Sequence, residues 1–96
     1  MAGRLSDADI ASGLADLPGW ARDGDTIVKA YECPSFPDAI AFVVRIGFFA
    51  EKANHHPDLD VRWRTVRVAL STHDAGGITD KDLSLAREVE SVARSA

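Results

Sequence analysis

Two adjacent histidines followed by a proline stand out in the stretch Asn54-His55-His56-Pro57-Asp58. The chain has three histidines in 96 residues, and the third, His73, follows Leu70-Ser71-Thr72. Imidazole is the side chain whose ordinary pKa lies nearest neutral pH, and it is also a common metal ligand. Histidines that come together could therefore transfer protons or hold a metal ion.

The strands that follow the first two histidines predict where the third one lies. Residues 58–63 and 66–70 alternate apolar and polar side chains, which is typical of strands with one buried face. The short link at Arg64-Thr65 predicts an antiparallel hairpin. The start of its first strand and the end of its second then lie at the same edge of the sheet. We therefore expect the three histidines to converge there.

Three interpretations of this cluster are open. The histidines can be structural, capping the carbonyl groups at a helix end. They can bind zinc together with Glu51, although neighbouring side chains diverge and no His-Glu-x-x-His motif is present. They can be metal-free acid–base catalysts, with Glu51 favouring a protonated partner. Glu51 precedes His55 by four positions, so the two can lie on one helix face. Acid–base catalysis is the preferred interpretation.

Capping and periodicity predict the remaining elements. Ser6, Ser35 and Thr79 are each followed by an acidic residue three positions later, which is typical of a helix start. Helices are predicted over residues 7–17 and 36–53 and after Thr79, and Asp23-Gly24 predicts a first hairpin. The order αββαββα indicates one α+β domain over residues 1–96. Its four-stranded antiparallel sheet would have three helices packed on one face.

Two tryptophans lie outside the predicted helices. Trp63 shares the apolar side of its strand with Leu59 and Val61, so we expect it in the core. Trp20 follows Pro18-Gly19 at the start of the first hairpin. It could cover a flat ligand or simply pack against the core.

Composition and charge exclude several classes of protein. The chain is 46% hydrophobic and 27% charged, which is ordinary for a globular domain. Its longest mostly apolar run, residues 39–50, contains Arg45 and is too short to span a bilayer, so no membrane partner is expected. The net charge of −4 makes nucleic acid an unfavourable partner. A charge-balanced hairpin tip accounts for the basic cluster Arg62, Arg64 and Arg67.

The number of cysteines and the first residues of the sequence indicate the cellular compartment of the protein. The single cysteine, Cys33, cannot form an internal disulfide or a cysteine-rich metal site. The sequence becomes acidic at Asp7, where a signal peptide would need an apolar run. We expect a reduced, cytoplasmic protein.

The sequence resembles the pterin-4a-carbinolamine dehydratase family over nearly its whole length. The matching elements are Glu51-Lys52-Ala53-Asn54-His55-His56-Pro57, Trp63 six residues after the proline, Leu70-Ser71-Thr72-His73, Gly77 and Asp82. The stretch Pro18-Gly19-Trp20 is similar to the family's N-terminal pattern. The family's αββαββα fold agrees with the order predicted from periodicity.

The resemblance implies an activity and a site. Members of the family remove water from a 4a-hydroxytetrahydropterin to give the quinonoid dihydropterin; they use no metal or cofactor, and the pterin is the substrate. The resemblance implies that His55 and His73 are the acid–base pair, that His56 mainly holds the pterin, and that Glu51 and Asp82 orient the imidazoles. The implied substrate contacts are Trp20, Asn54, His55, His56, Pro57, Ser71, Thr72, His73 and Asp74. Mammalian relatives tend to carry Asp at position 54, so Asn54 cannot take a charged role.

The family also implies partners. Members are commonly homodimers or homotetramers, and they recycle the cofactor of aromatic amino acid hydroxylases. The broad apolar surface of the predicted helix 36–53 favours burial at a subunit contact. Some relatives are transcriptional coactivators or assembly factors, so a non-enzymatic binding module is the alternative. The retained histidines favour the enzyme.

Overall fold

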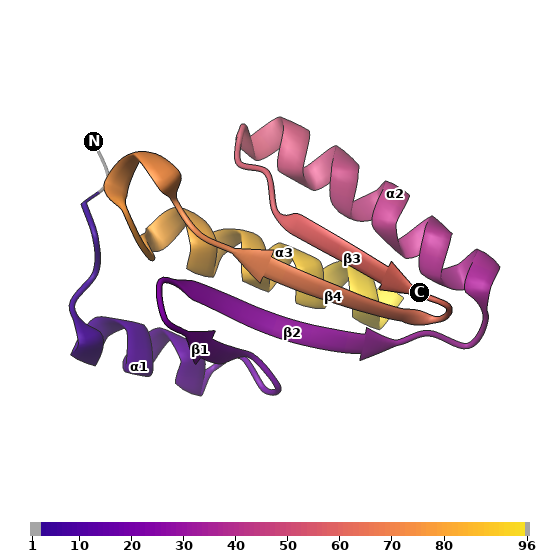
Figure 1. Ribbon diagram of the computed structural model, residues 1–96, viewed down its shortest axis with the longest axis horizontal. Helices are drawn as coiled ribbons and strands as arrows, with labels where there is room; N and C mark the ends of the chain where they lie inside the picture. The colour runs from indigo at the N-terminus through magenta and orange to yellow at the C-terminus, as the bar shows by residue number, and fades with distance from the viewer. Residues whose placement is uncertain (1–2, 96) are drawn as a thin grey trace.

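The computed structural model describes residues 3–95. In chain order it contains α1 (Asp7–Ala15), β1 (Ala21–Asp23), β2 (Thr26–Glu32), α2 (Phe36–Ala53), β3 (Asp58–Arg62), β4 (Thr65–Leu70), the 3₁₀ turn η1 (His73–Ala75) and α3 (Asp80–Ser95) (Figure 1). The predicted order αββαββα and the α+β class are confirmed. The first helix ends two residues earlier than predicted, because the next two N–H groups bond three residues back instead of four. The ends of the predicted 1–96 domain, residues 1, 2 and 96, lie outside the described residues.

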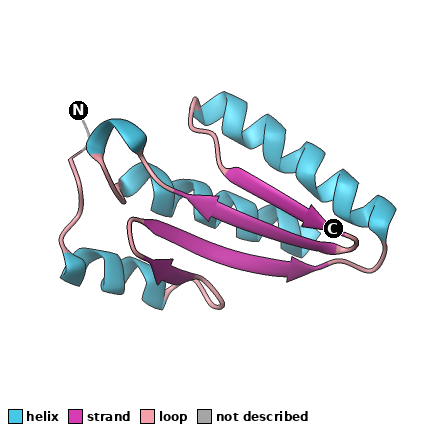
Figure 2. Cartoon of the chain, in the orientation of Figure 1, coloured by secondary structure: helices cyan, strands magenta, loops and turns pink. Residues whose placement is uncertain are grey.

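The four strands form one antiparallel sheet in the order β1-β2-β4-β3 (Figure 2). The two hairpins join where β2 pairs with β4, with Ile27 opposite Leu70. In the second hairpin Asp58 lies opposite Ala69. The start of β3 and the end of β4 therefore lie at one end of the sheet, as predicted for the segments that bear the histidines.

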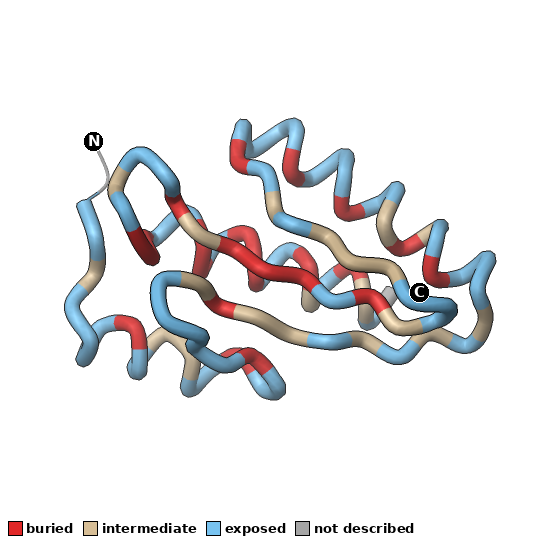
Figure 3. Tube along the Cα trace, in the orientation of Figure 1, coloured by how far each residue is buried: buried red, intermediate tan, exposed pale blue. Residues whose placement is uncertain are grey.

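One face of the sheet is buried against the helices. The β4 side chains Val66, Val68 and Leu70 and the β2 side chain Ile27 are at most 1% exposed. The α3 helix runs behind this face in the view of Figure 1, and α2 packs against α3. Buried side chains from all three helices join the same apolar cluster as these strand residues. Figure 3 shows the buried positions along β4 and on the inner side of α2.

The prediction that Trp63 lies in the core is wrong. Its side chain is 75% exposed. The strand β3 ends one residue earlier, at Arg62, and Trp63 opens the two-residue turn with a left-handed φ of 56°. The guanidinium carbon of Arg64 lies 5.3 Å from the centroid of the Trp63 ring. The alternating pattern of partly buried apolar side chains stops at Val61, because the chain reverses direction at Trp63 and Arg64.

The charged tip of this hairpin is balanced, as predicted. Arg62, Arg64 and Arg67 each have a carboxylate oxygen within 3.8 Å of a guanidinium nitrogen.

Within residues 3–95, no helix has both the length and the apolar character that a membrane crossing needs.

A polar cluster lies between the sheet and α3, around Glu90. Its Oε1 atom accepts hydrogen bonds from the Trp20 indole at 3.1 Å, from the Lys29 ammonium group and from the Tyr31 hydroxyl. Gly19 adopts a left-handed φ of 84°. A Cβ at this position would lie only 2.8 Å from Cε of Lys29, so a larger residue would collide with the Lys29 side chain. The face of β2 that bears Lys29 and Tyr31 is therefore the core face, and the buried Trp20 indole is bonded to Glu90 beside it.

Candidate active site

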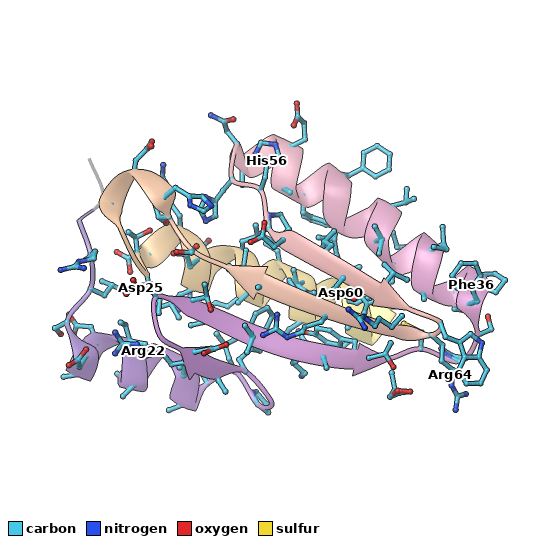
Figure 4. All side chains as sticks on the ribbon, in the orientation of Figure 1. Arg22, Asp25, Phe36, His56, Asp60 and Arg64 are labelled. Carbon is cyan, nitrogen blue, oxygen red and sulfur yellow. The ribbon has the colours of Figure 1, made fainter. Side chains whose placement is uncertain are left out.

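The two consecutive histidines that follow α2 lie in different environments, one buried and one exposed. Asn54 caps the helix in a left-handed conformation, with φ 50° and ψ 43°. The chain then leaves the helix through Pro57 and enters β3. As a result His55 is buried and His56 is exposed. Figure 4 shows His56 at this end of α2, with Phe36 at the other end.

The buried histidine contacts a buried carboxylate. Nε2 of His55 lies 2.6 Å from Oδ1 of Asp82, which is fully buried in the first turn of α3. The other carboxylate oxygen, Oδ2, accepts from the Thr79 backbone N–H and from the Thr72 hydroxyl, both at 2.9 Å. Asp82 therefore ties together the end of α2, the end of β4 and the start of α3.

The exposed histidine contacts a different acid. Nε2 of His56 lies 3.0 Å from Oε1 of Glu51, and both side chains are mostly in solvent. Glu51 therefore pairs with His56 and not with His55, which the helical spacing had favoured. The reason is Asn54: its left-handed geometry ends the helical repeat before His55. An ion pair this exposed is screened by water and contributes little to stability.

The third histidine lies in the loop that follows β4. His73 is exposed and opens η1, directly after Thr72. Thr72 forms an isolated bridge with Gly77, which closes the loop around η1. The hydroxyl of Ser71 donates to the carbonyl of Asp25 at 2.8 Å, while Asp74 is exposed. Among the described residues, no hydrogen bond joins His73 to the other histidines. Its chain neighbour Thr72 donates to Asp82, and Asp82 in turn contacts His55.

A cavity of about 480 Å³ opens between the end of α2 and the first turns of α3. His55, Phe49 and Leu85 line it, together with Lys52 and Lys81 at its charged side. Of the residues predicted for the site, this cavity touches His55 alone. His55 therefore both contacts Asp82 and contributes to the lining of the cavity.

Two further residues change the predicted site. Trp20 lies away from the buried His55, because its indole bonds to Glu90. Glu90 is eight residues, or about 12 Å, further along α3 than Asp82, the partner of His55. Thr79 was predicted only as a helix cap, but its hydroxyl lies 2.7 Å from that of Thr72, inside the buried network. The signal for this role was present in the sequence, in the capping spacing between Thr79 and Asp82.

The side chains of the site are arranged around carboxylates. Within the described part of the chain, no group of three or more His, Cys, Asp or Glu side chains is placed to hold a metal ion. His55 and His56 each face an acid instead. An imidazole held by a buried carboxylate is suited to proton transfer. The fold and this pair define a small α+β protein with a candidate acid–base site.

Comparison with known proteins identifies the family. Residues 3–92 match the family model described as Pterin 4 alpha carbinolamine dehydratase. The chain is 56% identical over 92 residues to a Roseiflexus sp. (strain RS-1) protein, covering 96% of this chain and 99% of that one. It is 54% identical over 90 residues to a Nocardia farcinica protein, covering 94% and 95%. Both carry the name "Putative pterin-4-alpha-carbinolamine dehydratase". The chain belongs to the pterin 4 alpha carbinolamine dehydratase family.

Solved structures share the fold. A Brucella melitensis protein described as a transcriptional coactivator/pterin dehydratase superposes with a TM-score of 0.91 at 29% identity, covering 95% of this chain and 99% of that chain. A pterin dehydratase-like protein, identified as a RuBisCO assembly factor in the alpha-carboxysome, superposes with a TM-score of 0.68 at 20% identity, covering 81% and 93%. At that identity the second likeness concerns the fold alone.

Proposed function

We propose that the protein removes water from a 4a-hydroxytetrahydropterin and releases the quinonoid dihydropterin. The observation that supports this most directly is the buried pair of His55 and Asp82, at the same end of the sheet as His73. The C4a hydroxyl is a poor leaving group until an acid protonates it, and N5 has to lose a proton to a base. As the N5–H bond breaks, its electrons form the C4a=N5 double bond, and the C4a–O bond breaks to release water. Proton transfer alone balances this reaction, so the proposal includes no metal or cofactor.

The proposed roles follow the position of each side chain. His55 and His73 are the acid–base pair, and Asp82 orients His55. His56 and its partner Glu51 hold the pterin from the exposed side. The remaining contacts are assigned to residues of the two adjoining loops: Asn54, Pro57, Ser71, Thr72 and Asp74. Trp20 is left out of the proposed site, because it is enclosed in the core and bonded to Glu90.

A dehydration assay with purified protein tests the proposal. We expect acceleration over the spontaneous reaction, and a loss of about a hundredfold or more in kcat for His55→Ala and for His73→Ala. The double variant should lose less than the sum of the two, because the residues act as one unit. No acceleration by the wild-type protein would overturn the proposal. Activity lost on EDTA treatment and restored by zinc would favour a metal site instead.

The proposed setting is the recycling of a tetrahydropterin cofactor in the cytoplasm. An aromatic amino acid hydroxylase would supply the 4a-hydroxy substrate. The single thiol of the chain, Cys33, is free and half-buried, which is compatible with a reducing compartment. Fractionation of the native cells should recover the protein in the cytoplasmic fraction, and recovery outside it would contradict this setting.

Contact with another protein chain is a second candidate function, supported by the outer surface of α2. Phe36, Ile40, Val44 and Phe48 recur every four residues, which places them on one helix face, and they are 40% to 73% exposed. An apolar stripe of this length marks a contact surface. We propose that its occupant is a second copy of the chain, in a homodimer or homotetramer. A non-enzymatic role, as coactivator or assembly factor, would use the same surface.

Sedimentation and activity together separate these possibilities. We expect the wild-type protein to sediment as a dimer or tetramer at micromolar concentration and Phe48→Glu to shift it toward monomer. Ala11→Glu, the same charge change at an exposed site on α1, should leave the assembly unchanged. A wild-type monomer would contradict the proposed self-association. A protein that assembles but does not accelerate dehydration would favour the binding module over the enzyme.

A further inference from the structure

Three buried polar side chains next to His55 form a series of hydrogen bonds in which the donor and the acceptor of each bond can be assigned. Thr72, Thr79 and Asp82 are at most 8% exposed. Each threonine hydroxyl has one hydrogen to give. Thr72 gives its hydrogen to Oδ2 of Asp82. The 2.7 Å contact between the two hydroxyl oxygens must therefore use the hydrogen of Thr79, whose oxygen accepts in turn from the Lys81 N–H at 3.2 Å.

This direction limits where a proton can lie on Asp82. Oδ2 already accepts from the Thr72 hydroxyl and from the Thr79 N–H, which leaves no room for a proton of its own. Any carboxyl proton must be on Oδ1, which lies 2.6 Å from Nε2 of His55. Two lone pairs at that distance would repel each other, so a hydrogen lies between these two atoms. Nε2 is therefore committed to Asp82.

The other ring nitrogen of His55 is in a different situation. Among the described residues, Nδ1 has no hydrogen-bond partner. Within the same part of the chain, every fully enclosed side-chain nitrogen or oxygen does have a partner. Nδ1 therefore reaches the surface of the protein, and it is the ring nitrogen that can meet a bound molecule.

We propose that Thr72 and Thr79 are positioning residues that hold Asp82 as an acceptor, so that His55 keeps its Nε2 hydrogen and exchanges the reaction proton at Nδ1. This proposal rests on the dehydratase function proposed above and specifies the atom that performs it. Thr79 does not touch the substrate. It acts through Thr72 and Asp82, and it also begins the helix that supplies Asp82.

The tautomer of His55 can be measured without substrate. In full-length protein labelled with ¹⁵N at histidine, we expect a long-range ¹H–¹⁵N spectrum to show Nε2 bonded to hydrogen and Nδ1 free, at a pH where the ring is neutral. The opposite tautomer would overturn the proposal. Because this readout needs no turnover, a correct tautomer together with no dehydration would count against the proposed function and not against the hydrogen-bond order.

Asp82→Asn gives a sharper test, because the network predicts which way the new amide faces. Its carbonyl oxygen has to take the place of Oδ2, where the Thr72 hydroxyl and the Thr79 N–H both donate. Its NH₂ group then faces His55, and Nε2 must accept instead of donate. We expect the tautomer to reverse to Nδ1–H and kcat to fall by roughly a hundredfold or more, with KM changed little. An unchanged tautomer in a folded Asp82→Asn protein would overturn the proposed direction.

Thr79→Val and Thr79→Ser test the positioning role directly. Valine keeps the shape of the side chain without the hydroxyl, whereas serine keeps the hydroxyl. We expect Thr79→Val to speed the exchange of the Nε2 hydrogen with solvent and to lower kcat severalfold, and Thr79→Ser to restore both. Thr72→Val repeats the test from the strand side if Thr79→Val folds poorly. Exchange and kcat equal to wild type in a folded valine variant would overturn the role of that threonine.

Discussion

Nε2 of His55 and Oδ1 of Asp82 lie 2.6 Å apart, although 27 positions separate the two residues in the sequence. Because of this contact, we expect the free energy of unfolding to depend more on His55 than on the other two histidines. Removing His55 leaves a fully buried carboxylate oxygen without a partner, so His55→Ala should lower the free energy of unfolding by about 1–3 kcal/mol. His73→Ala, at an exposed position, should change it by less than about 0.5 kcal/mol. Urea denaturation monitored by circular dichroism measures both.

His56→Ala is the matched control for this prediction. It removes a histidine that also faces a carboxylate, but the pair with Glu51 is exposed and screened. Its unfolding free energy should match that of His73→Ala. Equal losses for all three alanine variants would contradict the buried pair.

The environment of Glu90 predicts a loss of stability in acid. Burial raises the pKa of Glu90, but hydrogen bonds from Lys29 and Tyr31 outweigh it and bring the pKa below its ordinary value of 4.5. The unfolded chain then binds the proton more readily, so the stabilisation is present above about pH 4.5 and is lost as pH falls through the lower folded pKa. Unfolding free energies measured from pH 6 down to pH 3 should show a shallower fall for Glu90→Gln than for wild type. Glu88→Gln, at an exposed position on the same helix, should follow the wild type.

Tyr31 predicts a second loss of stability, in alkali. Burial, and next the hydrogen bond to Glu90, raise the pKa of Tyr31 well above its ordinary value of 10.0. Its contribution to stability is therefore complete below about pH 10 and declines above it. Tyr31 is the one tyrosine of the chain, so phenolate absorbance reports it alone. We expect phenolate to appear in the folded protein only as it unfolds, whereas in denaturant it should titrate near pH 10. Reversible ionisation near pH 10 without unfolding would contradict the buried hydroxyl.

The two tryptophans should respond very differently to the same substitution. Trp63 is exposed at a turn and its main packing partner is the Arg64 guanidinium, so Trp63→Ala should change the unfolding free energy by no more than about 1 kcal/mol. Trp20 is buried and bonded to Glu90, so Trp20→Ala should cost about 3–5 kcal/mol. Guanidinium denaturation compares them. A larger loss at Trp63 than at Trp20 would mean that the hairpin tip is buried in solution, for example by a second subunit.

Local patterns in the sequence predicted much of the fold and part of the site. The capping spacing from Thr79 to Asp82 placed the carboxylate in the first helical turn, and Pro57 marked the exit from α2. Antiparallel pairing then brought the end of β4 to the same place. The partner of Glu51 did not follow from these patterns, because the four-residue rule assumes that the helix continues through Asn54.

Other features depend on contacts that no local pattern encodes. Glu90 binds Lys29 across 61 positions and Trp20 across 70. Nothing in the neighbourhood of any one of these residues indicates its partners, so a ligand-binding Trp20 and a packing Trp20 were equally compatible with the sequence. Trp63 shows a related limit: alternation indicates which side of a strand is buried, but it does not indicate at which residue the strand ends.

The pairing of β2 with β4 has a consequence for the order of folding. Each hairpin closes over a two-residue turn. The pairing of β2 with β4 instead brings together Glu32 and Thr65, which are 33 positions apart, and the intervening chain contains the whole of α2. Closing the longer loop loses more chain entropy, so we expect the two hairpins to form early and their union to come late. The first hairpin contributes none of the residues His55, Thr72 and Asp82, which come from the second hairpin's two ends and from α3. During refolding, the contact between His55 and Asp82 should therefore not depend on that union, whereas the bonds from Trp20 and Lys29 to Glu90 should form only when the first hairpin joins the rest of the fold.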